Sequence, residues 1–338
     1  MKKILFILAL PFFAFSQQTI NGSIMHDNMQ RDYILYVPAM YNASNPTPLV
    51  FNFHGYTSNA NSQMWYGDFR SIADTAGFII VHPMGSLDNS GITHWNVGWG
   101  SSTVDDIGFT AALIDSLSTN YNINQNRIYS TGMSNGGYFS YHLACNLSAK
   151  IAAIASVTGA MSQYTQTICN PSHSTPVMEI HGTADLTVAF NDIVSGLGYW
   201  RSYNNCNSIA DTTIIPDLVL GDGSTVEHIV FDNGDNNVTT ELFKVINGGH
   251  TWPGSNFPNS NGITNYDINA SVEIWKFFSR YDINGLINSS TFVTEIESKG
   301  KKLIKIVDVL GRESFSIKNS PLFYIFDDGS VEKKLIIK

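Results

Sequence analysis

A serine with a glycine two residues to either side is the most informative feature of the sequence. The motif is Gly132-Met133-Ser134-Asn135-Gly136, between a strand-like run at 127–130 and a helix-like stretch at 138–147. A sharp strand-to-helix turn brings neighbouring backbones so close that larger side chains would clash, and glycine relieves this. Such a turn exposes the serine hydroxyl near the positive end of a helix. The strand-then-helix context argues against a chance match, and the motif predicts that Ser134 is a nucleophile.

A serine hydroxyl is inert at its own pKa and needs a histidine base that a carboxylate holds in place. Where such a motif belongs to a parallel sheet, the acid and then the base follow the serine in the chain, each on a loop after a strand. Asp185 lies just after a strand-like run at 177–181, and His250 lies just after another at 239–246. Ser134, Asp185 and His250 are therefore the predicted catalytic residues.

Rival residues exist for both roles, because the chain has nine histidines. Only His250 combines a place after the acid, a post-strand loop and flanking glycines. Asp185 is preferred because it directly follows an apolar strand. The other downstream carboxylates considered are Glu179, Asp211, Asp217 and Asp222. Asp105 and Asp106 fall in the first turn of a predicted helix at 104–121, where the helix dipole favours negative charge, so we expect them to be structural.

Two backbone N–H groups are expected to stabilise the negative charge that develops on a substrate carbonyl. One is that of Asn135, directly after the nucleophile. The other is that of Tyr56, in the loop after a strand-like run at 48–53, where Gly55 allows close approach. Three tryptophans could stack on a sugar or an aromatic acyl group, or could equally belong to the core: Trp95, Trp99 and Trp252.

Strand-like and helix-like segments alternate along most of the chain. Strands are predicted at 32–38, 48–53, 77–81, 127–130, 151–157, 176–182, 226–231 and 239–246. Helix-compatible stretches lie at 59–76, 104–121, 138–147, 192–203 and 267–281. This alternation predicts an α/β fold, a mostly parallel sheet with helices on both faces.

Both ends of the chain differ from its middle. Lys2 and Lys3 precede an apolar run that ends in a small-x-small pattern, so residues 1–16 are predicted to be a signal peptide of a secreted protein. Its twelve apolar residues are too few for a membrane span. Residues 17–290 hold 8 Lys and Arg against 21 Asp and Glu, whereas 291–338 hold 9 against 7. This shift marks a domain boundary.

The overall composition excludes some classes of protein. With 43% hydrophobic and 14% charged residues the chain is globular. Its net charge of −9 argues against nucleic acid as a partner. The predicted organisation is a signal peptide, a catalytic domain at 17–284, a linker at 285–290 and a C-terminal domain at 291–338. The three cysteines suggest one disulfide and one free thiol.

Five motifs, in this order, resemble the polyhydroxybutyrate depolymerase and feruloyl esterase group, carbohydrate esterase family 1. The motifs are His54-Gly55, Val104-Asp105-Asp106-Ile107-Gly108-Phe109, Gly132-Met133-Ser134-Asn135-Gly136-Gly137, His181-Gly182-Thr183-Ala184-Asp185 and Gly249-His250-Thr251-Trp252-Pro253-Gly254. The resemblance runs from about residue 21 to 281. It implies an α/β-hydrolase fold with Ser134 as nucleophile, Asp185 as acid and His250 as base, and no metal or organic cofactor.

The cysteines depart from the pattern of this family. Members often pair a cysteine near position 206 with one in the later strand region, but residues 226–246 contain none here. The resemblance therefore favours a disulfide between Cys145 and Cys169.

Residues 291–338 are similar to the C-terminal sorting domain of the type IX secretion system. The features are Leu303 to Glu313 and the ending from Tyr324 to Lys338, which alternate as the short strands of a small β-sandwich would. An alternative is a carbohydrate-binding or adhesive module of the same shape. The similarity implies export machinery as a partner.

Together these features predict a secreted serine esterase that acts through an acyl-enzyme. Its expected substrates are feruloyl or acetyl esters on plant polysaccharide, and the alternative within the fold is a polyester depolymerase. The other possible functions are a serine peptidase and a non-catalytic surface-binding protein. The ordered set of Ser, Asp and His argues against the non-catalytic protein.

Overall fold

The computed structural model describes residues 17–100, 102–257, 261–287, 303–307, 321–326 and 331–335. The chain divides into two compact units, residues 1–287 and 288–338. The expected signal peptide lies outside the described residues. Within them, no helix combines the length and the apolar character that a membrane crossing requires.

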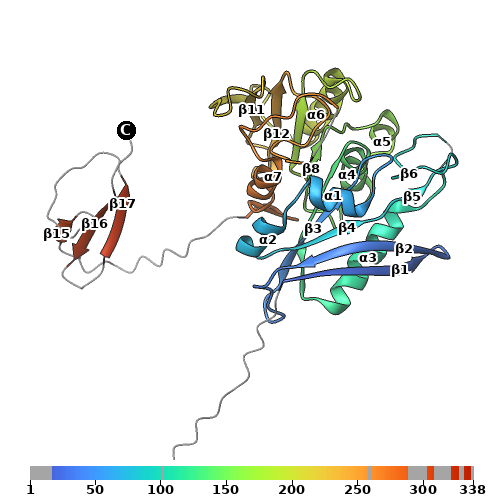
Figure 1. Ribbon diagram of the computed structural model, residues 1–338, viewed down its shortest axis with the longest axis horizontal. Coiled ribbons are helices and arrows are strands. Elements are labelled where there is room, and N and C mark those ends of the chain that lie inside the picture. Colours follow the sequence, from blue (N-terminus) through green and yellow to red (C-terminus); the bar gives the residue numbers. More distant parts are fainter. Residues whose placement is uncertain are drawn as a thin grey trace, which may run out of the picture. The chain divides into compact units, whose positions relative to one another are not determined.

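One ten-stranded sheet organises the larger unit (Figure 1). Its six central strands, β4, β3, β7, β8, β9 and β12, run parallel, and the strands outside them pair antiparallel. This confirms the predicted mostly parallel sheet. In spatial order the strands are β1 (Gln18–His26), β2 (Met29–Val37), β4 (Ile79–Pro83), β3 (Thr47–Phe53), β7 (Ile123–Met133), β8 (Ala153–Val157), β9 (Val177–Gly182), β12 (Thr240–Ile246), β11 (Thr225–Phe231) and β10 (Asp211–Ile215).

Helices cover both faces of this sheet, as the alternating side chains of its strands require. Phe51 packs in a core with Phe139 of α4, whereas Val50 packs in a second core with Phe277 of α7. The helices are α1 (Ala60–Tyr66), α2 (Arg70–Ala76), α3 (Asp106–Asn120), α4 (Asn135–Asn146), α5 (Gln163–Ile168), α6 (Phe190–Tyr203) and α7 (Ala270–Phe278), with a 3₁₀ turn at Asp235–Asn237.

The stretch 59–76 forms two helices, α1 and α2, and not one. Gly67 ends α1, and its carbonyl oxygen accepts a hydrogen bond from Nδ2 of Asn52 (2.9 Å). A Cβ at position 67 would lie 2.9 Å from the Trp252 ring, so the chain can turn this close to the core only with glycine. The buried Phe69 then redirects the chain into α2.

Asp105 and Asp106 at the start of α3 have the structural roles that the sequence predicts. The carboxylate of Asp105 accepts the backbone N–H of Gly108 and caps the helix (2.8 Å). Asp106 is buried, and its Oδ1 lies 2.6 Å from Nη2 of Arg31. A cap and a buried ion pair thus account for both carboxylates.

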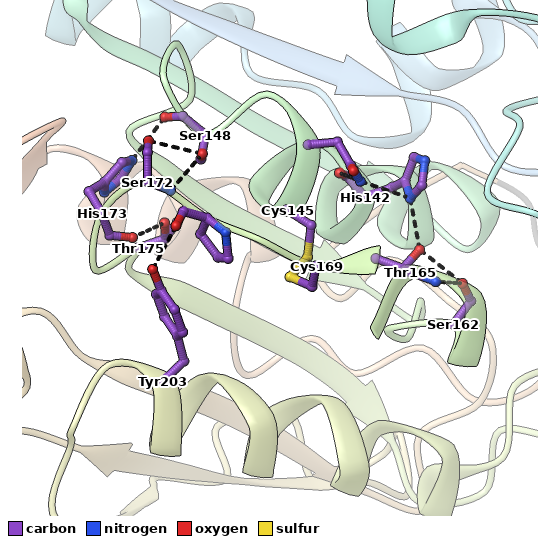
Figure 2. The surroundings of a disulfide bond; sticks show 12 residues. His142, Cys145, Ser148, Ser162, Thr165, Cys169, Ser172, His173, Thr175 and Tyr203 are labelled. Atoms are coloured by element: carbon purple, nitrogen blue, oxygen red, sulfur yellow. Dashed lines mark hydrogen bonds between the residues drawn. A yellow bond between two sulfur atoms is a disulfide. The ribbon is translucent and has the colours of Figure 1, made fainter. Parts of the chain in front are cut away.

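A disulfide joins Cys145 of α4 to Cys169 at the end of α5, the pair that the resemblance implies (Figure 2). Nearby, Nδ1 of His142 lies 2.9 Å from Oγ1 of Thr165, so a second contact links the same two helices. Cys206 is a free thiol. Because α4 directly follows Ser134, these contacts anchor the helix behind that residue.

Three short hairpins or sheets complete the described residues. β5 (Ser86–Leu87) pairs with β6 (Thr93–His94), and β13 (Tyr281–Asp282) pairs with β14 (Gly285–Leu286). In the smaller unit, β15 (Leu303–Val307), β16 (Pro321–Phe326) and β17 (Val331–Leu335) form one antiparallel sheet. The second sheet of the expected sandwich is not among the described residues of this unit.

Candidate active site

Ser134 lies at the turn between β7 and α4 with φ 53° and ψ −118°, a left-handed conformation that is rare for a residue with a side chain. The glycines around it are sterically required. A Cβ at position 132 would lie 2.6 Å from the carbonyl oxygen of Phe53, and a Cβ at position 136 would lie 2.3 Å from it. The packing of this turn against the end of β3 therefore explains the G-x-S-x-G spacing.

Asp185 and His250 meet at the edge where the parallel strands β9 and β12 end. The Nδ1–H of His250 donates to Oδ2 of Asp185 at 2.7 Å, and both side chains are buried. Oδ1 of Asp185 accepts the backbone N–H groups of Thr187 (2.8 Å) and Val188 (2.9 Å). These bonds fix the carboxylate, and the carboxylate in turn fixes the orientation and tautomer of the imidazole.

A pocket of about 230 Å³ is lined by Ser134 and His250 together, with Gly55 and Tyr56 on its wall. Burial alone would raise the pKa of Asp185, but the hydrogen bond from His250 and those from the two backbone amides lower it below its ordinary value. The carboxylate is therefore ionised at neutral pH, and it can stabilise a positive charge on His250.

His54 fixes the loop that carries Tyr56. Its Nε2 accepts the backbone N–H of Gly85 (2.9 Å), so its Nδ1 carries the proton and donates to the carbonyl oxygen of Gly55 (2.7 Å). Burial lowers the pKa of His54 to about 4, which keeps the ring neutral. A Cβ at Gly55 would lie 3.4 Å from Cβ of Ser134, so this loop passes directly beside the serine.

Asn135 is the first residue of α4, where backbone N–H groups have no partner within the helix. Its side chain makes two bonds to the backbone of Trp95: Oδ1 accepts the N–H (2.7 Å), and Nδ2 donates to the carbonyl oxygen (3.1 Å). These two bonds lock the start of α4. The predicted oxyanion donors, the N–H groups of Tyr56 and Asn135, thus belong to two segments that flank Ser134.

Two of the three candidate stacking tryptophans are core residues, which is one of the two possibilities that the sequence left open. Trp95 is fully buried, with its ring 4.9 Å from that of Phe53, and Trp252 is 1% exposed, with Nε1 donating to Oγ of Ser271 (3.1 Å). Neither lines the pocket of Ser134, although Trp252 forms part of the wall of a separate pocket. Trp99 is exposed but does not line the pocket of Ser134, because its ring packs edge-on against Tyr138.

A buried pair behind Asp185 is not expected from the sequence. Oε1 of Glu179 lies 3.1 Å from Nδ1 of His181, and Nε2 of His181 donates to the carbonyl oxygen of Val188 (2.9 Å), next to the amide that holds Asp185. Burial would lower the pKa of His181, but the hydrogen bond to Glu179 raises it. Because positions 179 and 181 share one face of a strand, their spacing was the available signal.

Among the described residues, one cluster could hold a metal ion: His26, Asp27 and Asp105 have ligand atoms within 4.8 Å of one another. None of the three lines the pocket of Ser134. Asp105 already caps α3, and exposed acidic groups often cluster without an ion.

Comparisons with known proteins find similar chains that are named esterases. A phospholipase/carboxylesterase family model matches residues 102–210. A bifunctional acetylxylan esterase/xylanase of Neocallimastix patriciarum is 27% identical over 81% of this chain and 36% of its own length. A probable feruloyl esterase C of Aspergillus flavus is 30% identical over 55% of this chain and 66% of its own length. The chain thus spans about a third of the first relative and about two thirds of the second.

Among solved structures, the acetyl xylan esterase from Aspergillus awamori superposes with a TM-score of 0.57 at 13% identity, covering 78% of this chain and 99% of that one. The chain therefore has the α/β-hydrolase fold. The family model is that of a phospholipase/carboxylesterase family, and the two relatives are named esterases.

Proposed function

We propose that this α/β-hydrolase is a serine carboxylic-ester hydrolase that acts through an acyl-enzyme. The observation that supports this most is the 2.7 Å bond from His250 to an ionised Asp185, because His250 lines the same pocket as Ser134. A nucleophile, an acid and a base in this order along the chain, each after a strand, suit acyl transfer.

In this mechanism His250 takes the hydroxyl proton of Ser134 as the oxygen attacks the ester carbonyl. The Tyr56 and Asn135 N–H groups stabilise the resulting oxyanion, while Asp185 stabilises the imidazolium. His250 then gives the proton to the departing alcohol, and an ester joins the acyl group to Ser134. Water, activated by the same imidazole, attacks this ester and releases the acid.

We propose acetyl or feruloyl esters on plant polysaccharide as the substrates. The proposal draws on the relatives, which are named acetylxylan and feruloyl esterases. The pocket of about 230 Å³ beside Ser134 has room for a compact acyl group. A polyester depolymerase has no specific observation in its favour.

We further propose that the protein is exported by its leader and, through its C-terminal unit, by a type IX system. The charge pattern of residues 1–16 and the strand pattern of 291–338 support this. In a host with that system, extracellular esterase activity should disappear when residues 288–338 are removed, while intracellular activity remains. Export that is unchanged by the deletion would reject the role of this unit.

A substrate panel tests the enzymatic proposal. We expect the purified protein to release ferulate from methyl ferulate or acetate from acetylated xylan, and Ser134→Ala to lose turnover by at least about 10⁴-fold. Turnover of polyhydroxybutyrate alone would reject the substrate class. Full ester turnover by Ser134→Ala would reject the mechanism.

A further inference from the structure

A second, larger pocket of about 530 Å³ lies beside the one that holds Ser134. The two pockets share Tyr66 and Phe257, whose ring centroids are 5.7 Å apart and which form part of the wall of both. Ser134 and His250 do not line this second pocket. It is therefore placed to take a part of the substrate beyond the acyl group.

Trp65 of α1 lines this pocket and is 52% exposed, which is unusual for so large an apolar side chain. The guanidinium carbon of Arg70 lies 3.9 Å from the centroid of the Trp65 ring. Asp68 holds that guanidinium with two hydrogen bonds, from Nε (2.9 Å) and Nη2 (2.7 Å). The ring is thus supported by a fixed cation, which reduces the entropy lost when a ligand stacks on it.

Most of the other residues that line this pocket have polar side chains. Seven of its eleven lining residues carry hydroxyl, amide or carboxylate groups: Tyr66, Asp68, Ser71, Ser255, Asn256, Asn269 and Ser271. A fixed aromatic ring with hydroxyl and amide groups around it complements a pyranose ring, which has an apolar face of C–H groups and a rim of hydroxyls.

We propose that the Trp65 pocket binds sugar rings of the polysaccharide that bears the ester, while the acyl group occupies the pocket of Ser134. This inference rests on the proposed function and names the part of the substrate that the second pocket recognises. Trp65 is then a specificity-determining residue, which favours esters on a polymer over the same esters on a small alcohol.

Binding to an inactive protein tests this without any turnover. We expect Ser134→Ala to bind xylohexaose in calorimetry and Ser134→Ala/Trp65→Ala to bind it about tenfold more weakly, or below detection. Trp65→Phe should keep part of the affinity. Tyr164→Ala, which removes a half-exposed ring that lines neither pocket, is the matched control and should bind like Ser134→Ala. No binding by Ser134→Ala, or equal binding by the Trp65 variant, would overturn the inference.

Kinetics on two substrates separate this inference from the proposed function. For Trp65→Ala, we expect the ratio of kcat/KM on acetylated xylan to kcat/KM on a small acetyl ester to fall about tenfold. An unchanged ratio would overturn the inference and leave the esterase proposal standing. If Trp65→Ala lost as much kcat/KM on methyl ferulate as on acetylated xylan, the pocket would be assigned to the acyl group instead. No turnover of any ester by the wild type would refute the proposed function, and the binding experiment would still decide the role of Trp65.

Discussion

Ser134 adopts a backbone conformation that costs a non-glycine residue about 1–3 kcal/mol, and its neighbours hold it there. Its N–H donates to the carbonyl oxygen of Val157 (2.8 Å), and its own carbonyl oxygen accepts the N–H of Tyr138 (2.9 Å). One bond ties the residue to β8 and the other to α4. These two bonds hold the strained backbone of Ser134 from both sides of the turn, so its side chain stays at the pocket wall.

Asp185→Asn is the sharpest single-residue test of the proposed mechanism. We expect kcat on a small ester to fall by about 10³–10⁴-fold, because an amide cannot stabilise an imidazolium and favours the wrong imidazole tautomer. Thermal unfolding should confirm that the variant is folded.

Asp105→Asn is the matched control for this substitution, because Asn caps a helix about as well as Asp and Asp105 lies outside the pocket. Its kcat should equal that of the wild type. A kcat for Asp185→Asn within fivefold of the wild type would contradict the role of this carboxylate.

The sequence is informative about residues whose role depends on order and local turns, and less so about residues whose role depends on packing. Ser134, Asp185 and His250 each follow a strand, so their shared edge could be predicted. Burial of Trp95 and Trp252 depends on distant partners such as Phe53, which no local pattern reveals.

At the scale of elements, the turn at Ser134 packs closely against β3, whereas α6 has open space around Gly198. Replacing a glycine by alanine in these two places should therefore change the free energy of unfolding in opposite directions. A Cβ at Gly136 would meet backbone at 2.3 Å, whereas a Cβ at Gly198 in α6 has nothing within 4 Å. In urea unfolding, Gly136→Ala should lose roughly 2 kcal/mol or more, and Gly198→Ala should gain about 0.5–1 kcal/mol. Equal stabilities of the two variants would contradict this packing.

The contact between α4 and α5 gives a pH-dependent prediction (Figure 2). Burial lowers the pKa of His142 from 6.5 to about 4, so the unfolded chain takes up a proton below pH 6.5 that the folded chain refuses. Acidification from pH 8 to pH 5 should therefore cost the wild type about 2 kcal/mol that His142→Gln does not lose. In urea unfolding, the free energy of unfolding of His142→Gln should therefore come closer to that of the wild type by this amount between pH 8 and pH 5. Parallel stability curves against pH would contradict it.

Most central strands were predictable because they are buried on both faces and appear as unbroken apolar runs, such as β3. The break between α1 and α2 was not, because it depends on Gly67 meeting Trp252, far away in the sequence. β1 was also missed, because none of its nine residues is fully buried and its pairing with β2 defines it.

At the scale of the whole molecule, every residue assigned to the candidate site lies in the unit that ends at Ile287. We expect a chain that ends at Ile287 to keep kcat/KM on a small ester within twofold of the full chain. Ending the chain at Asn269 should abolish folding, because α7 contributes Ile274, Phe277 and Phe278 to the core. Loss of activity in the first truncation, with its fold retained, would contradict the independence of the larger unit.

Covalent labelling tests the central claim most directly, because it asks whether the hydroxyl of Ser134 is the activated nucleophile. The full chain is treated with a fluorophosphonate probe, and the adduct is located by intact mass and peptide mapping. We expect one adduct per chain, on Ser134, with none on Ser134→Ala and slow labelling of Asp185→Asn. An adduct on another residue, or equal labelling of Ser134→Ala, would contradict the proposed mechanism.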